Sequence, residues 1–125
     1  MALINMSNLI EKICWLPAAF ETIRTKSALQ LVQESVFFEN PGALSQSEVE
    51  NYLREHSYLV HDWLIWSADK RTDRGWYFLE EADHFVVGYS PPVGPLRDQI
   101  TFSDPVKACA EFVIRELDDF RQIFS

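Results

Sequence analysis

The sequence predicts one α+β domain over residues 1–125, with three N-terminal helices, a four-stranded antiparallel meander and a C-terminal amphipathic helix. Three observations lead to this prediction. Apolar residues recur every three or four positions near both ends of the chain, as they do along one face of a helix. Between them lie runs of aromatic and β-branched residues separated by short turns, which is typical of sequential antiparallel strands. The chain of 125 residues, 47% of them apolar, also has the right size for one domain with a real core.

The first part of the chain is predicted to be helical. Ser7 or Asn8 can cap a first helix, which Pro17 either ends or bends. A second helical pattern covers residues 27–37, where apolar side chains again follow a helical spacing. The sequence Asn-Pro-Gly at 40–42 then breaks the pattern, so we expect two helices before this point.

The third predicted helix starts at a capping box. Ser45 with Glu48, and Ser47 with Glu50, each have the spacing at which a hydroxyl and a carboxylate satisfy the free N–H groups of a helix start. The residues that follow at helical spacing are Val49, Tyr52, Leu53 and His56. We therefore expect this helix to begin near residue 46.

Four strands are predicted next. The run over about 58–68 is rich in aromatic and β-branched residues, which favour strands. Two further strands over 76–81 and 84–90 are joined by a tight two-residue turn. A Pro-rich loop, which cannot supply donors to a ladder, separates them from a last strand at about 97–102. Sequential strands with short connections indicate an antiparallel sheet, packed on one face against helices.

The last element is predicted to be an amphipathic helix. Ser-Asp-Pro at 103–105 is a typical helix start, and the pattern continues to about Ile123. The predicted buried stripe consists of Val106, Ala110, Val113, Ile114, Leu117, Phe120 and Phe124. The predicted solvent-facing ladder consists of Lys107, Glu111, Arg115 and Asp119.

The acidic charge narrows the classes of partner. With 19 acidic and 11 basic residues the formal net charge is −8, which disfavours binding to nucleic acid or to an anionic membrane surface. A basic protein would be attracted to such a surface, although the charge can also serve solubility alone. The N-terminus lacks a basic region and no apolar run is long enough to span a membrane, so we expect a cytoplasmic protein.

The sequence contains no pattern that predicts catalysis or a cofactor. Cys14 and Cys109 lie far apart among apolar residues, without the spacing of a metal site, and we expect buried free thiols. His56, His61 and His84 each adjoin an acid, but no metal-binding spacing links them, so structural or surface roles are expected. We predict no catalytic residue, no cofactor and no metal, although a disulfide or a small enzyme pocket remains an alternative.

Acidic and aromatic residues are concentrated along the predicted strands. On the strand over 76–81, Trp76 and Phe78 point to one face, while Tyr77 and Leu79 point to the other. Both faces therefore carry large apolar groups, more than a sheet with one open face requires. Either helices cover both faces, or one face is a partner surface with aromatic anchors and an acidic rim.

The segments 76–81, 85–89, 100–104 and 108–113 together resemble small immunity proteins of bacterial polymorphic toxin systems, of the contact-dependent growth-inhibition type. The shared features are an aromatic strand in a meander, a Phe-Ser helix start and an Ala-Cys amphipathic helix. The resemblance implies a cytosolic, non-enzymatic inhibitor that binds one cognate toxin domain, often a basic nuclease, and occludes its active site.

This interpretation predicts a set of partner-binding residues. They are the acids Asp69, Asp73, Glu80, Glu81 and Asp83, with Trp66 as an aromatic anchor. A monomer that binds a folded toxin is expected. The main alternative is an acidic secretion chaperone, similar to those of type III systems, which would dimerise and hold an effector segment. Such chaperones have a helix between groups of strands, whereas this sequence predicts uninterrupted strands.

Overall fold

The computed structural model describes residues 10–11, 13–18, 45–69 and 75–124. Its elements are α4 (Gln46–Glu55), α5 (Leu59–Asp69), β1 (Gly75–Glu81), β2 (His84–Ser90), β3 (Arg97–Phe102) and α6 (Pro105–Phe124), preceded by helical residues within 10–18. The chain is therefore α+β, as predicted. The helix predicted over 27–37 lies outside the described residues.

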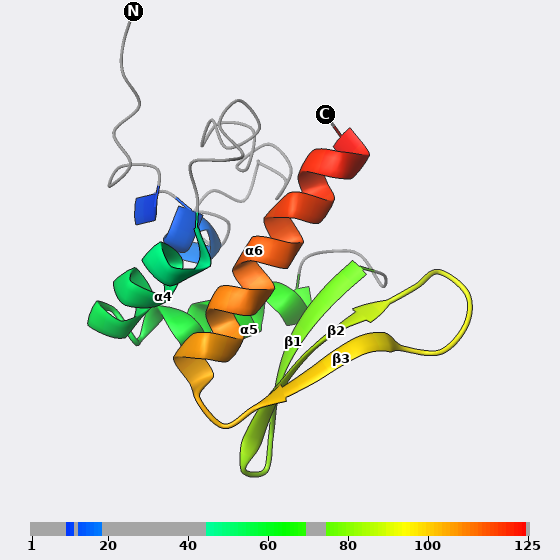
Figure 1. The fold of residues 1–125 in the computed structure, drawn as a ribbon, viewed down its shortest axis with the longest axis horizontal. Coiled ribbons are helices and arrows are strands. Elements are labelled where there is room, and N and C mark those ends of the chain that lie inside the picture. The colour runs from blue at the N-terminus through cyan, green and yellow to red at the C-terminus, as the bar shows by residue number, and fades with distance from the viewer. Residues whose placement is uncertain (1–9, 12, 19–44, 70–74, 125) are drawn as a thin grey trace, which may run out of the picture.

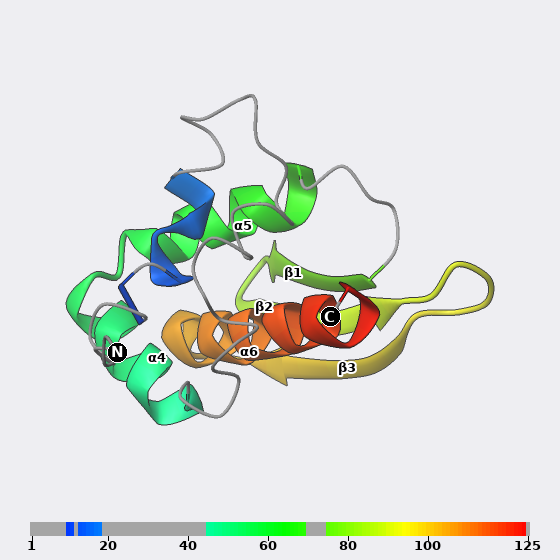
Figure 2. The same ribbon diagram turned by 90° about the horizontal axis from the view of Figure 1, so that it is seen from above.

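The sheet has three strands in the order β1-β2-β3, all antiparallel. Helix α6 lies across one face of the sheet, and α5 runs beside β1 (Figures 1 and 2). The Phe78 backbone N–H donates a hydrogen bond of 2.8 Å to the Ser67 hydroxyl of α5. The helix therefore occupies the free edge of β1, where unpaired backbone groups could otherwise pair with another chain.

The prediction of a fourth strand over 58–68 is wrong, because these residues form α5. Trp63 and Trp66, one helical turn apart, are both buried, as are Leu59 and Val60 one turn earlier. In a strand Trp63 and Trp66 would point to opposite faces, whereas in a helix both reach the core. Burial on this helical stripe overrides the strand preference of the aromatic and β-branched residues.

The predicted helix after Ser45, the strands over 76–81, 84–90 and 97–102, and the C-terminal helix are confirmed with closely similar boundaries. Ser45 is the N-cap of α4: its hydroxyl accepts a hydrogen bond of 3.3 Å from the Glu48 backbone N–H and donates one of 3.0 Å to the Glu48 carboxylate. Helix α6 starts at Pro105, immediately after its cap. The Ala82-Asp83 turn sets the β1–β2 pairing, with Glu81 opposite His84.

The core lies between α6, α5 and the covered face of the sheet. The Phe78 and Phe112 rings stack with centroids 5.8 Å apart, and Trp63 meets Phe112 edge-on at 6.1 Å. The Trp63 indole N–H donates to the Cys14 carbonyl at 3.1 Å, which ties the N-terminal helical residues to α5. Each large aromatic side chain thus fills space between two elements, and the polar N–H of this Trp is satisfied.

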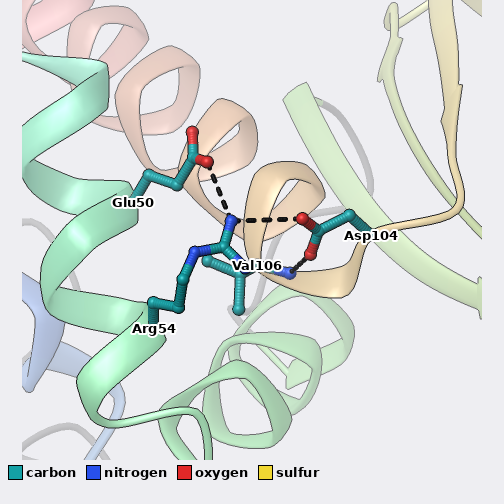
Figure 3. Close-up of polar contacts among 4 residues, drawn as sticks. All are labelled: Glu50, Arg54, Asp104 and Val106. Carbon is teal, nitrogen blue, oxygen red and sulfur yellow. Dashed lines mark hydrogen bonds and ion pairs between the residues drawn. The ribbon is translucent and has the colours of Figure 1, made fainter.

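An ion-pair network joins α4 to the start of α6 (Figure 3). The Arg54 guanidinium lies 2.9 Å from Glu50 and 3.1 Å from Asp104, and the second Asp104 oxygen accepts a hydrogen bond of 2.9 Å from the Val106 N–H. Burial acts to raise the pKa of Asp104, but the bonds from Arg54 and Val106 outweigh it, and the pKa is lowered. Asp104 therefore stays ionised while it caps α6.

Cys14 and Cys109 are both buried free thiols in the same core cluster. Burial raises the pKa of Cys14 to about 12. Burial also raises the pKa of Cys109, and the nearby Cys14 raises it further. Both side chains are therefore held as neutral thiols at physiological pH.

None of the helices in the described parts of the chain combines the length and the apolar character needed to cross a membrane.

Candidate functional site

The two faces of the sheet differ in what covers them. On one face, Phe78 and Val87 are buried in the core beneath α6. On the other, Leu79 is 43% exposed, and its cross-strand neighbours are Val86 and Thr101. The described helices pack against the first face, so the second is open in the described part of the chain (Figure 2).

Tyr77 lies flat across the open face. Its ring crosses Gly88 on β2, and its hydroxyl accepts a hydrogen bond of 2.6 Å from the Gln99 side-chain amide on β3. A Cβ atom on Gly88 would collide with the Tyr77 ring, so the glycine makes this arrangement possible. The half-buried Tyr77 ring therefore lies on the same face as the exposed Leu79.

The acidic β1–β2 hairpin borders this face. Glu81 lies on the same face as Tyr77 and Leu79, because residues of a strand alternate. His84 bridges the acids, with its ring nitrogens 2.9 Å from Asp83 and 3.6 Å from Glu81. The hydrogen bond donated by His84 lowers the pKa of Asp83, which therefore stays ionised at the tip of the hairpin.

Glu80 and Asp83 complete the hairpin, and both are exposed. The Asp83 side chain is 91% exposed. Three of the predicted partner acids, Glu80, Glu81 and Asp83, are therefore brought together at one end of the sheet. We call Tyr77, Leu79, Glu81 and Asp83 the acidic sheet surface, and Glu80, which points to the other face of β1, adds a charge at the same end of the sheet.

The other predicted partner residues are placed differently. Trp66 is only 1% exposed, and its indole N–H donates a hydrogen bond of 3.0 Å to the buried Glu116 carboxylate. A buried side chain cannot contact a partner, so Trp66 belongs to the core and not to the surface. Asp69 ends α5, but its side chain is outside the described part of the structure, as is the whole of Asp73.

A pocket of about 240 Å³ lies away from the hairpin, between α6 and the sheet, and was not predicted from the sequence. Its lining consists of Trp76, Tyr89, Arg97, Arg115, Asp118, Asp119 and Gln122. Part of the pocket could have been predicted from the two-residue turn at 82–83. The turn fixes the pairing of β1 with β2, and counting back from it places Trp76 opposite Tyr89. A register irregularity in β3 brings Arg97 opposite Tyr89, and counting could not foresee it.

The histidines occupy separate places. The His56 ring N–H donates a hydrogen bond of 3.0 Å to the Tyr52 carbonyl at the end of α4, His61 is exposed on α5, and His84 belongs to the hairpin. Within the described ranges, no three His, Cys, Asp or Glu side chains are arranged to hold a metal ion.

Comparisons with protein families, with curated proteins and with solved structures found no match for this chain.

Proposed function

We propose that this chain is an inhibitor protein that binds a basic partner protein through the acidic sheet surface. The observation that carries the proposal is the continuity of this surface, in which the half-buried Tyr77 ring and the exposed Leu79 side chain lead directly into the acids of the hairpin. Protein interfaces commonly have such a centre, which loses water on binding, and a polar rim that stays partly hydrated.

The charge of the rim favours a basic partner. Glu80, Glu81 and Asp83 add to a chain with a formal charge of −8. Complementary charge steers two proteins together and raises the association rate, by about ten- to a thousandfold at low salt. The affinity itself would depend more on the burial of Tyr77 and Leu79, since aromatic anchors carry most of the binding energy at interfaces.

The resemblance to contact-dependent growth-inhibition immunity proteins suggests which basic protein this is. A nuclease toxin is basic where it holds phosphate, and an acidic inhibitor that covers this region blocks access of the nucleic acid. We therefore propose a cognate toxin domain as the partner, bound by a monomer of this chain.

The test compares capture of a partner by two charge-reversed variants. Glu80→Lys with Glu81→Lys changes the hairpin, whereas Glu11→Lys with Glu55→Lys makes the same change in charge at exposed helical positions remote from the sheet. We expect the wild-type chain and the helical variant to retain a basic protein from a lysate of the source organism, and the hairpin variant to lose it. The captured protein should lose a measurable enzymatic activity in a 1:1 complex.

Three outcomes would contradict the proposal. Equal capture by the two variants would remove the hairpin from the interface. A stable homodimer that holds an unfolded segment would indicate a secretion chaperone. Absence of any protein partner, with both variants folded by circular dichroism, would exclude the inhibitor function.

A further inference from the structure

We infer that the pocket between α6 and the sheet binds a carboxylate group through Arg97 and Arg115. Both guanidinium groups line this pocket, together with Trp76 and Tyr89. The inference does not rest on the proposed function, because the pocket and the acidic sheet surface share no residue.

Each arginine places its guanidinium group over an aromatic ring. The Arg97 guanidinium carbon lies 4.5 Å from the centre of the Tyr89 ring, and that of Arg115 lies 4.6 Å from the centre of the Trp76 ring. The two rings contact each other edge to face, with centroids 5.2 Å apart and planes at 71°. A cation–π contact of this kind favours this position of the guanidinium and leaves N–H donors available at its edge.

The backbone of β3 is arranged to bring a cation to this pocket. If the residues of β3 alternated strictly from Phe102 and Ile100, Asp98 would point to the face of the sheet that α6 covers. An extra residue in β3 shifts the register, Asp98 adopts a positive φ of 56°, and Arg97 comes opposite Tyr89 instead. Bulges commonly redirect a side chain in this way, and here the change replaces an acid with a base.

Both arginines keep hydrogen-bonding capacity. Arg115 uses its Nε to donate a bond of 2.7 Å to Glu111, and the Nε of Arg97 is 3.8 Å from Asp98, which is too long for a hydrogen bond. In the described part of the chain, no other carboxylate lies within 4 Å of either group. A guanidinium has five N–H donors, so the contacts with described residues use only a few of these ten.

Size and charge decide between classes of anion. Pockets for drug-sized ligands measure about 300–1,000 Å³, so a pocket of about 240 Å³ suits a small acid or the end of one side chain better than a nucleotide. Asp118 and Asp119 also line the pocket and would repel a phosphate dianion more strongly than a monoanion. A planar carboxylate matches the guanidinium fork in geometry as well as in charge.

The carboxylate can come from a free small acid or from an acidic residue of another protein, and one titration distinguishes them. The probes are sodium acetate, the peptide acetyl-Ala-Glu-Ala-amide and inorganic phosphate, each added at constant ionic strength to the isotope-labelled protein. Acetyl-Ala-Gln-Ala-amide is the uncharged control peptide. The readout is the NMR signal of the Trp76 indole N–H, assigned with Trp76→Phe.

We expect a saturable shift of this signal with acetate or with the Glu peptide, and none with the Gln peptide. Tighter binding of acetate would identify a small acid as the ligand, and tighter binding of the Glu peptide would identify a protein side chain. Arg97→Gln should weaken binding by roughly tenfold or more, and Arg97→Lys should restore only part of it, because lysine lacks the fork.

Lys107→Gln is the control for charge, since Lys107 is exposed in the first turn of α6, outside the pocket lining, and the change also removes one positive charge. Equal weakening by Lys107→Gln and Arg97→Gln, tighter binding of phosphate than of either carboxylate, or no saturable shift would overturn the inference. Arg115→Gln is a second variant, but it also breaks the bond to Glu111. Arg97 decides the question, because its side chain is 62% exposed and its replacement leaves the core intact.

Discussion

The covered and open faces of the sheet are built from alternate residues of the same strands, yet they differ in burial. Phe78 is buried against Phe112, whereas its neighbour Leu79 faces outward. The side chains of the covered face pack against many other side chains of the core, so they contribute more to stability than exposed side chains do. An exposed side chain of the open face, such as Leu79, contributes little to stability, so it can be used for recognition without unfolding the protein.

The largest expected effect tests this contrast directly. Phe78→Ala should lower the free energy of unfolding by about 3–5 kcal/mol, because it removes a buried aromatic ring and leaves a cavity. Leu79→Ala should lower it by less than about 1 kcal/mol, since much of that side chain is already in water. Urea denaturation of both variants measures the difference. Similar losses at the two positions would mean that the open face is buried in solution.

The covered side also contains the two buried thiols, which predict a loss of stability at alkaline pH. The pKa of Cys14 is raised from its ordinary value of 9.0 to about 12, and that of Cys109 is raised as well. Above pH 9 the unfolded chain releases these protons while the folded chain keeps them. The stabilisation present below pH 9 is therefore lost as the pH rises, by roughly 1.4 kcal/mol per pH unit for each thiol.

Urea denaturation at about pH 8 and about pH 10.5 measures this slope. The control is Cys14→Ala with Cys109→Ala, which should show a shallower decline even though its stability at neutral pH is lower. An unchanged slope in this variant would show that other groups cause the loss.

A smaller effect is expected inside the open face. Gly88→Ala should destabilise the protein by about 1–3 kcal/mol, because the new Cβ collides with the Tyr77 ring. In a Tyr77→Ala background the same change should cost much less, since the ring is gone. A double-mutant cycle measures this coupling, and strictly additive losses would show that the ring does not lie across Gly88.

The smallest effect is expected at the hairpin. Glu80→Lys with Glu81→Lys should change the free energy of unfolding by no more than about 0.5 kcal/mol, as is usual for exposed positions. The same variant should lose the proposed partner. A large destabilisation would show that Glu80 and Glu81 are needed for folding. The loss of binding would then be explained by unfolding and not by the loss of a contact.

Local signals in the sequence predicted much of the fold correctly. The capping box at Ser45, the tight turn before His84 and the helix start at 103–105 each depend on neighbours in sequence, and the structure confirms them. The run at 58–68 was misassigned because its composition favours a strand while its burial repeats every three to four residues. Its length was the available warning, since strands usually span only about five or six residues.

The candidate site was less predictable, because it depends on contacts between distant segments. The sequence identified the exposed acids of the hairpin, but nothing local distinguishes the buried Trp66 from an exposed anchor. The meeting of Arg97 and Arg115 depends on the register shift in β3 and on where α6 crosses the sheet. Neither the register shift nor the position of α6 can be predicted from a short segment of the sequence.

Helix α6 has a consequence for how the chain is made. It packs against α4, α5 and the three strands, and it follows all of these elements in the sequence. On the ribosome, Trp63 and Phe78 emerge well before Phe112, the ring that both of them contact. The aromatic side chains of α5 and β1 therefore remain uncovered until α6 has emerged, and chaperones can bind them during that interval.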